Sequence, residues 1–154
     1  MKNLYYPPVG FYFAVSVMPL INGNLSFQSI SGLSSEMVTE NYRAGGVDFD
    51  YKLPVKTQYS NLVMKKGLWV EDRDNAGKAE GKLAVWFQET MLQWQIKPQT
   101  IYIGLLKNEN EAIIAWEVFN AWPKKWSISD FNAEESKIAI ETMEFYYDYF
   151  KISK

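Results

Sequence analysis

Four carboxylates near the C-terminus are the residues of this chain whose type is most suited to acid–base chemistry: Glu134, Glu135, Glu141 and Glu144. A glycosidase needs two carboxyl groups that face the same sugar. On a final strand, Glu141 and Glu144 point to opposite faces because side chains alternate along a strand. The spacing therefore indicates no catalytic pair. A hydrolase built on this Glu-rich region stays an alternative, which a pH-rate profile showing a raised carboxylate pKa would detect.

A second acidic run, EDRDNAG, resembles the start of a calcium loop. Asp72 and Asp74 lie two residues apart and Gly77 takes the position of the sharp turn. Ala76, however, fills a ligand position, and Leu83 stands where the loop needs a bidentate Glu. The motif fails, and the run is interpreted as an acidic turn that precedes a helix.

The composition excludes most other classes of catalytic site. The chain has no His and no Cys, so it lacks the commonest general base, the commonest transition-metal ligand and any thiol nucleophile. Neither a Ser nucleophile elbow nor a phosphate-cradling Gly-rich loop is visible. We therefore predict no enzyme, no cofactor and no metal. The absence of Cys fits a chain folded in a reducing cytoplasm.

Length and net charge limit the number of domains and the kinds of binding partner. The 154 residues predict one domain, 1–154, with its own core. A net charge of -2 argues against nonspecific binding of nucleic acid through a global positive field. Aromatic residues make up 16% of the chain, too many for one small core, so some are expected at subunit contacts. We expect neither a signal peptide nor a membrane-spanning segment.

The elements that would position these residues are mostly strands. Alternating apolar residues predict a strand from Phe11 to Val17, and Asn22-Gly23 predicts the turn of its hairpin. A long hairpin with a Gly-Gly tip is predicted at about 36–52, and Pro54 is expected to end its second strand. The pattern alone leaves open an ordinary surface hairpin, in which the glycines only turn the chain. The next strand is expected to carry Lys65-Lys66 on its exposed side.

One helix is predicted at about 79–94, where large apolar residues recur at steps of three and four. This stripe is interpreted as core packing, and its members are Leu83, Trp86, Phe87, Met91 and Trp94.

The sequence of the C-terminal third predicts a strand, a turn and a second strand. Apolar alternation around Trp116 is interrupted from Asn120 to Pro123 and resumes at Trp126. A brief turn at 130–135 and one long final strand are expected after it. The fold class is mainly β with one flanking helix, as a small antiparallel β-barrel or an orthogonally packed β-sandwich.

These patterns include five stretches that together resemble a known family. They are PPVGFYFAV, FQSISGLS, YRAGG, KLPVKTQYSNLVMKKGL and NAWPKKWSISDFNAEESKIAIETMEF. In this order they are similar to the tail-tube (inner tube) proteins of contractile phage tails and related contractile injection systems. The resemblance implies the phage tail-tube fold and a structural subunit whose hexameric rings stack into a hollow tube driven by sheath contraction.

The resemblance also implies roles for particular residues. Candidates for contacts between subunits or rings lie in the projecting hairpin: Tyr42, Arg43, Gly45, Gly46, Val47 and Asp48. The family motif and core are expected at Phe27, Gly32, Leu33, Leu53, Pro54, Asn120, Trp122, Pro123 and Trp126. Trp122 and Trp126 are expected to be largely buried.

The implied partners are further copies of the chain, a contractile sheath, baseplate and spike proteins, and a protein effector or DNA as cargo in the lumen. Assembly is expected in the bacterial cytoplasm, within a phage-like particle or injection system that can be released. Two alternatives stay open besides the hydrolase. One is a tube-initiator or baseplate adaptor that forms a single ring, and the other is a monomeric ligand-binding β-barrel.

Overall fold

A computed structural model describes residues 12–67, 73–108, 111–130 and 139–153 of the chain. Residues 131–135, which cover most of the turn expected after Asp130, lie outside these ranges. Within the described ranges, the helix falls short of the length and apolar character that a membrane crossing requires.

The described chain is mainly β with one helix, as the sequence patterns predict. Its elements, in chain order, are β1 (Tyr12–Met18), β2 (Ile21–Phe27), β3 (Ser29–Ser31), β4 (Ser35–Tyr42), β5 (Tyr51–Tyr59), β6 (Leu62–Gly67), α1 (Arg73–Gln93), β7 (Gln99–Asn108), β8 (Glu111–Ile128), β9 (Ile140–Tyr146) and β10 (Tyr149–Ile152). All pairings between these strands are antiparallel.

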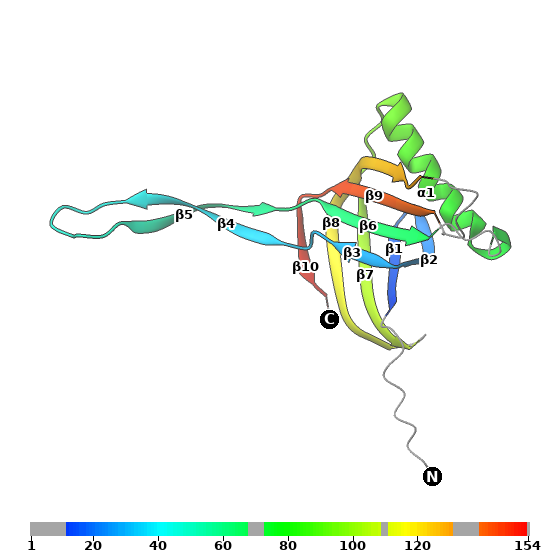
Figure 1. The fold of residues 1–154 in the computed structure, drawn as a ribbon, viewed down its shortest axis with the longest axis horizontal. Helices are drawn as coiled ribbons and strands as arrows, with labels where there is room; N and C mark the ends of the chain where they lie inside the picture. Colours follow the sequence, from blue (N-terminus) through cyan, green and yellow to red (C-terminus); the bar gives the residue numbers. More distant parts are fainter. Residues whose placement is uncertain (1–11, 68–72, 109–110, 131–138, 154) are drawn as a thin grey trace, which may run out of the picture.

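The long strand β8 belongs to two sheets. The strand order is β2-β1-β7-β8-β9-β6-β3, with β10 also paired to β8. The first half of β8 pairs with β7 and β10, and its second half pairs with β9. We call β2-β1-β7-β8-β10 sheet 1 and the second half of β8 with β9, β6 and β3 sheet 2. Figure 1 shows the strands of sheet 2 running across those of sheet 1.

The predicted strand-turn-strand around Asn120 is wrong, because β8 is one continuous strand with a bend. Asn120 adopts a φ of 54°, and the hydrogen-bonding partner changes there from β7 to β9. Pro123 is tolerated because the register with β9 shifts between Pro123 and Lys125, which marks a bulge. The residues that suggest a turn therefore mark the corner between the two sheets.

The core fills the space between the two sheets and the helix. Sheet 1 contributes Val15 and Ile103, and sheet 2 contributes Phe145, all 1% exposed or less. Trp86 and Phe87 of α1 close the interior, with ring centroids 5.5 and 5.3 Å from that of Phe145. One amphipathic helix thus covers the opening between crossing sheets, a common way to bury its apolar stripe.

The helix ends about where it is predicted to end, but the prediction that its whole apolar stripe packs in the core is wrong for the last two residues of the stripe. Leu83, Trp86 and Phe87 are buried, but Met91 is 40% and Trp94 87% exposed. The helix ends at Gln93, and Trp94 follows with a φ of 55°, so its side chain leaves the buried face. At the other end the helix begins at Arg73, before the predicted residue 79.

Two other strand predictions also need correction. The first hairpin turns at Pro19 and Leu20, and Asn22-Gly23 lies inside β2. In this register Val17 pairs with Ile21, and both side chains are buried. The predicted final strand is in fact two strands, β9 and β10, because the chain turns at Tyr147 and Asp148 to return to the first half of β8.

Candidate assembly surface

The hairpin of β4 and β5 forms an arm that projects from the two sheets (Figure 1). The two strands are paired from Ser35↔Tyr59 at the base to Tyr42↔Tyr51 near the tip. Among the described residues they pair with no other strand. Pro54 does not end the hairpin as predicted, because a register shift between Val38 and Thr39 accommodates it inside β5.

The tip of the arm holds the six residues expected to contact other subunits. Tyr42 ends β4, and residues 43 to 48 lie between the strands, where Gly46 has a φ of 85°. The Arg43 Nε lies 4.0 Å from the Asp50 Oδ1 across this loop, and both side chains are largely exposed. The structure therefore gathers the predicted contact residues at the far end of the arm.

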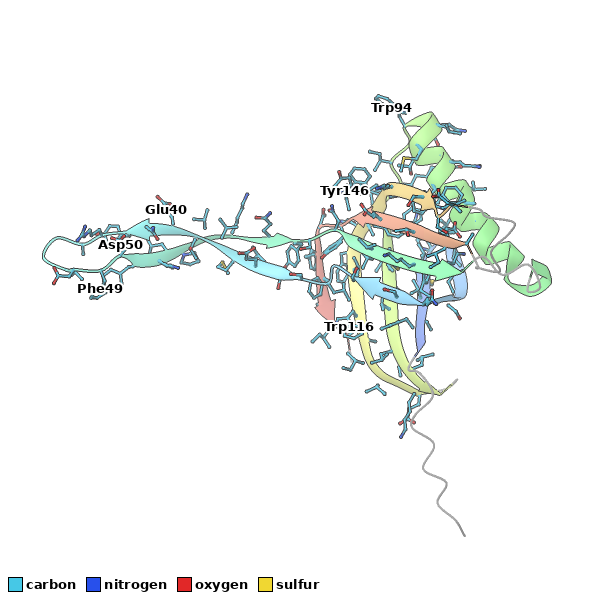
Figure 2. All side chains as sticks on the ribbon, in the orientation of Figure 1. Glu40, Phe49, Asp50, Trp94, Trp116 and Tyr146 are labelled. Carbon is cyan, nitrogen blue, oxygen red and sulfur yellow. The ribbon has the colours of Figure 1, made fainter. Side chains whose placement is uncertain are left out.

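The arm also exposes large apolar side chains, of which sequence reasoning assigns only Tyr42 to contacts. Those at least 45% exposed are Met37, Tyr42, Phe49, Tyr51, Leu53 and Val55. Leu53 and Pro54, expected in the core, are exposed on β5, so their assignment to the core is wrong. The alternation of Phe49, Tyr51, Leu53 and Val55 is the signal for this apolar stripe. In Figure 2, Glu40, Phe49 and Asp50 lie toward the end of the arm, far from the helix.

The base of the arm is tied to the turn between β9 and β10. The Tyr147 hydroxyl donates a hydrogen bond to the Gly32 carbonyl oxygen at 2.9 Å. The Tyr59 ring packs against Tyr147 and Phe150, with centroids 5.9 and 5.6 Å away. Burial raises the pKa of the Tyr147 phenol, while a hydrogen bond from the backbone of Ser34 acts in the opposite direction. These contacts fix the direction in which the arm leaves the domain.

Gly32 occupies a position at this base that admits no side chain. Its φ is +92°, and a Cβ there would lie 1.8 Å from the carbonyl oxygen of Asn61. The neighbouring Leu33 packs against the core, and Phe27, another expected core residue, is 4% exposed.

The remaining residues of the expected motif line sheet 2. Pro123 is buried, but Trp122 and Trp126 are only partly buried. Trp122 packs on Tyr146 with a centroid distance of 4.6 Å, and Trp126 packs on Phe87 at 5.5 Å. Asn120 is exposed and donates from Nδ2 to the Asp148 Oδ2 at 2.7 Å, which ties the corner of β8 to the turn before β10.

A buried ion pair lies beside Trp126. The Lys66 Nζ is 3.7 Å from the Glu141 Oε2, and the two residues are 7% and 5% exposed. The Trp126 Nε1 donates to the other carboxylate oxygen of Glu141. The predicted exposure of Lys66 is therefore wrong, because its strand turns it inward toward a carboxylate on β9. Glu144 points to the outer face, which confirms that Glu141 and Glu144 do not share a side.

Comparison with known families explains this architecture. The family model of the T4-like virus tail tube protein gp19 matches residues 9–151. The chain belongs to this tail tube protein family. The resemblance drawn from the five stretches is thus confirmed, as are the predicted fold class and the role of the chain as a structural inner-tube subunit.

Solved tail tube structures agree with this assignment. A chain of the PVC sheath-tube complex, an extracellular contractile injection system in its extended state, superposes with a TM-score of 0.74 and 26% identity, covering 97% of this chain and 93% of that one. A chain of the anti-feeding prophage tube terminating cap gives a TM-score of 0.73 and 26% identity over 100% and 95%. A search of curated protein sequences finds no match.

The same fold recurs at lower identity. Hcp1 from Flavobacterium johnsoniae superposes with a TM-score of 0.57 at 13% identity, covering 93% of this chain and 95% of that one. At this identity the likeness concerns the fold alone. It shows that the crossing sheets and the flanking helix are common to tail tube proteins and to Hcp1.

Proposed function

We propose that this tail tube protein forms hexameric rings that stack into a hollow tube, and that the arm makes the contacts between neighbouring subunits and rings. The observation that carries this proposal is the arm itself. It leaves the domain as a two-stranded ribbon with exposed apolar side chains along its shaft. Exposed apolar surface of this extent is typical of a contact with another protein. The family membership supports the view that the other protein is a further copy.

The geometry favours a head-to-tail contact. The arm projects on one side of the domain, whereas the helix covers the opposite side (Figure 1). A contact between two different surfaces of identical subunits closes into a ring when the rotation is suitable. Subunit contacts of this kind also satisfy sheet edges, which otherwise favour aggregation.

The partners outside the tube follow from its relatives. We infer that a contractile sheath surrounds the tube, that baseplate and spike proteins hold its tip, and that a protein effector or DNA travels in its lumen. A chain that matches this one comes from a sheath-tube complex, which supports the sheath. Assembly would take place in the bacterial cytoplasm, within a phage-like particle. The role is mechanical, and no enzymatic step is proposed.

Removal of the tip tests the proposal. A variant that lacks residues 44–47 loses the loop of the arm but none of the residues assigned to β4 or β5. We expect it to keep the fold, measured by circular dichroism and urea unfolding, and to lose long tubes in negative-stain electron microscopy. Gly45→Ala is the matched control, because a Cβ there meets no atom within 4 Å. Long tubes formed by the shortened variant would show that the tip is not the contact between rings.

A single-ring role is the second candidate. It is supported by the match to a chain of a tube terminating cap, at an identity equal to that of the sheath-tube match. A tube-initiator or adaptor protein would form rings that do not polymerise. Light scattering across a range of concentrations separates the two, because only a tube subunit gains mass continuously as concentration rises.

A further inference from the structure

The two faces of sheet 2 differ in chemistry. Cross-strand pairing places one residue of each strand in register, so each row across the sheet can be identified. A row that faces the core contains Ile30, Met64, Met143 and Trp126. The two adjacent rows, which face away from the core, contain Ser29, Lys65, Thr142 and Ser127 in the first and Ser31, Val63, Glu144 and Lys125 in the second.

The outward rows are dominated by small hydroxyl side chains and lysines. Lys124, at the bulge of β8, adds a further cation, and its Nζ lies 3.6 Å from the Glu144 Oε2. These positions therefore carry three lysines and one glutamate, whereas the whole chain has a net charge of -2. The outward face of sheet 2 is thus a local positive surface on an acidic protein.

The outward faces of both sheets carry aromatic rings. Sheet 1 exposes Tyr102 and Tyr149, which are 38% and 45% exposed, and Tyr149 stacks on Phe119 at 4.6 Å. Sheet 2 carries Trp122 and Tyr146 in a third outward row next to the bend of β8, and Tyr146 is 39% exposed. Exposed aromatic side chains of this kind are enriched where proteins contact one another. The hydroxyl and lysine rows of sheet 2 are therefore the part of its outward face that suits a surface bordering water.

The two edges of sheet 2 also suit pairing with neighbouring copies into one continuous sheet around a ring. Among the described residues, β3 pairs only with β6, and residues 122–128 of β8 pair only with β9. The two outer strands of sheet 2 therefore keep free backbone groups on opposite edges. Pairing of one edge with the other edge of a neighbouring copy would extend the sheet around a ring without changing which face points inward.

We propose that the outward face of sheet 2 lines the channel of the tube and gives it a cationic wall that favours anionic surfaces on the cargo. This inference rests on the proposed assembly into tubes. In a narrow channel, one sign of charge repeated by every copy adds up, because the protein walls focus the field into the water. Lys65 and Lys125 are the residues that set this sign, and the hydroxyls keep the wall hydrated so that cargo slides past it.

The absence of Cys makes the proposal directly testable, because a single introduced thiol can be labelled without background. Thr142→Cys places a thiol on the central strand β9 of sheet 2, directly opposite Lys65. Ser26→Cys places one on β2 of sheet 1, at an exposed position, and is the matched control. Ser127→Cys, in the same row as Thr142, serves if Thr142→Cys does not assemble.

Assembled tubes of each variant are first verified by electron microscopy and then treated with a bulky polyethylene glycol maleimide. We expect the Thr142→Cys tubes to resist this reagent and the Ser26→Cys tubes to react, while both react as dispersed subunits. Equal reaction of the two kinds of tube would overturn the assignment of the lumen. Failure of the unmodified protein to form tubes would instead overturn the proposed assembly, and with it the inference.

The sign of the wall is measured with two small thiosulfonates, one anionic and one cationic, on the same tubes. For each position we take the ratio of the labelling rate of the anionic reagent to that of the cationic one. We expect this ratio to be several-fold higher at position 142 than at position 26. The gain should shrink in Lys65→Gln and at about 1 M salt, where the screening length falls to roughly 3 Å. A ratio that favours the cationic reagent at position 142 would overturn the cationic wall while leaving the location intact.

Discussion

Replacement of Gly32 by alanine is expected to destabilise the subunit at the base of the arm. Two physical terms contribute. A non-glycine residue held at a φ of +92° stores about 1–2 kcal/mol of backbone strain. The new Cβ would also lie 1.8 Å from the Asn61 carbonyl oxygen, and real Cβ contacts are not shorter than 3.0 Å, so the backbone must move by more than 1 Å.

This movement breaks nearby hydrogen bonds. The Tyr147 hydroxyl bonds to the Gly32 carbonyl oxygen at 2.9 Å, and the Ser60 amide bonds to the Ser34 carbonyl oxygen at 3.2 Å. Each such bond contributes about 0.5–1.5 kcal/mol. Together with the strain, Gly32→Ala should lower the free energy of unfolding by about 2–5 kcal/mol, a large fraction of the roughly 5–15 kcal/mol of a typical domain.

Two glycines at the tip of the arm separate the backbone strain from the steric clash. Gly46 has a φ of +85° but free space around its Cβ position, so Gly46→Ala carries the strain alone, about 1–2 kcal/mol. Gly45 has neither feature, and Gly45→Ala should be close to neutral. Urea unfolding of dispersed subunits, followed by Trp fluorescence at one low protein concentration, measures the series. Equal losses for Gly32→Ala and Gly46→Ala would refute the steric argument.

Three further predictions concern buried and partly buried groups near the core. Lys66→Met leaves the Glu141 carboxylate buried without its cation, and should cost about 3–5 kcal/mol in urea unfolding; a neutral result would mean that water reaches the pair. Trp126→Ala removes a partly buried large aromatic and its hydrogen bond to Glu141, and should cost at most about 3–5 kcal/mol, the range for a fully buried ring; an unchanged melting curve would place that ring outside the core. Burial raises the pKa of Tyr147 above 10.0 in the fold, so the unfolded chain loses this proton first and stability falls as pH rises past about 10. Tyr147→Phe should reduce that alkaline loss and should cost about 0.5–1.5 kcal/mol at neutral pH through its bond to Gly32; an unchanged alkaline unfolding profile would count against it.

Local patterns in the sequence predict the elements better than their partners. The stripe of Leu83, Trp86 and Phe87 identifies the buried face of α1, because helical periodicity depends only on neighbours along the chain. The same reasoning fails at Trp94, where a positive φ ends the helix. Asn22-Gly23 is a strong local turn signal, but the packing of Ile21 against the core selects another register.

The features that sequence reasoning missed depend on contacts between distant segments. Lys66 is buried because Glu141 lies beside it across two paired strands, and no local pattern reveals that pairing. Asn120 and Pro123 suggest a turn because they are typical turn residues, yet they bend a strand whose two halves join different sheets. The candidate contact residues at the tip were found through the family resemblance, and the apolar shaft required the structure to show its exposure.

The isolation of the arm has a consequence for the kinetics of polymerisation. Among the described residues no third strand pairs with the arm, and an isolated two-stranded hairpin is only marginally stable in water. In the proposed assembly, the first subunits that meet order two such hairpins before a complete binding surface exists, whereas a subunit arriving at a finished ring meets that surface already formed. We therefore expect tube growth to show a lag phase that added tube fragments abolish, and elongation from existing ends to dominate over the start of new tubes.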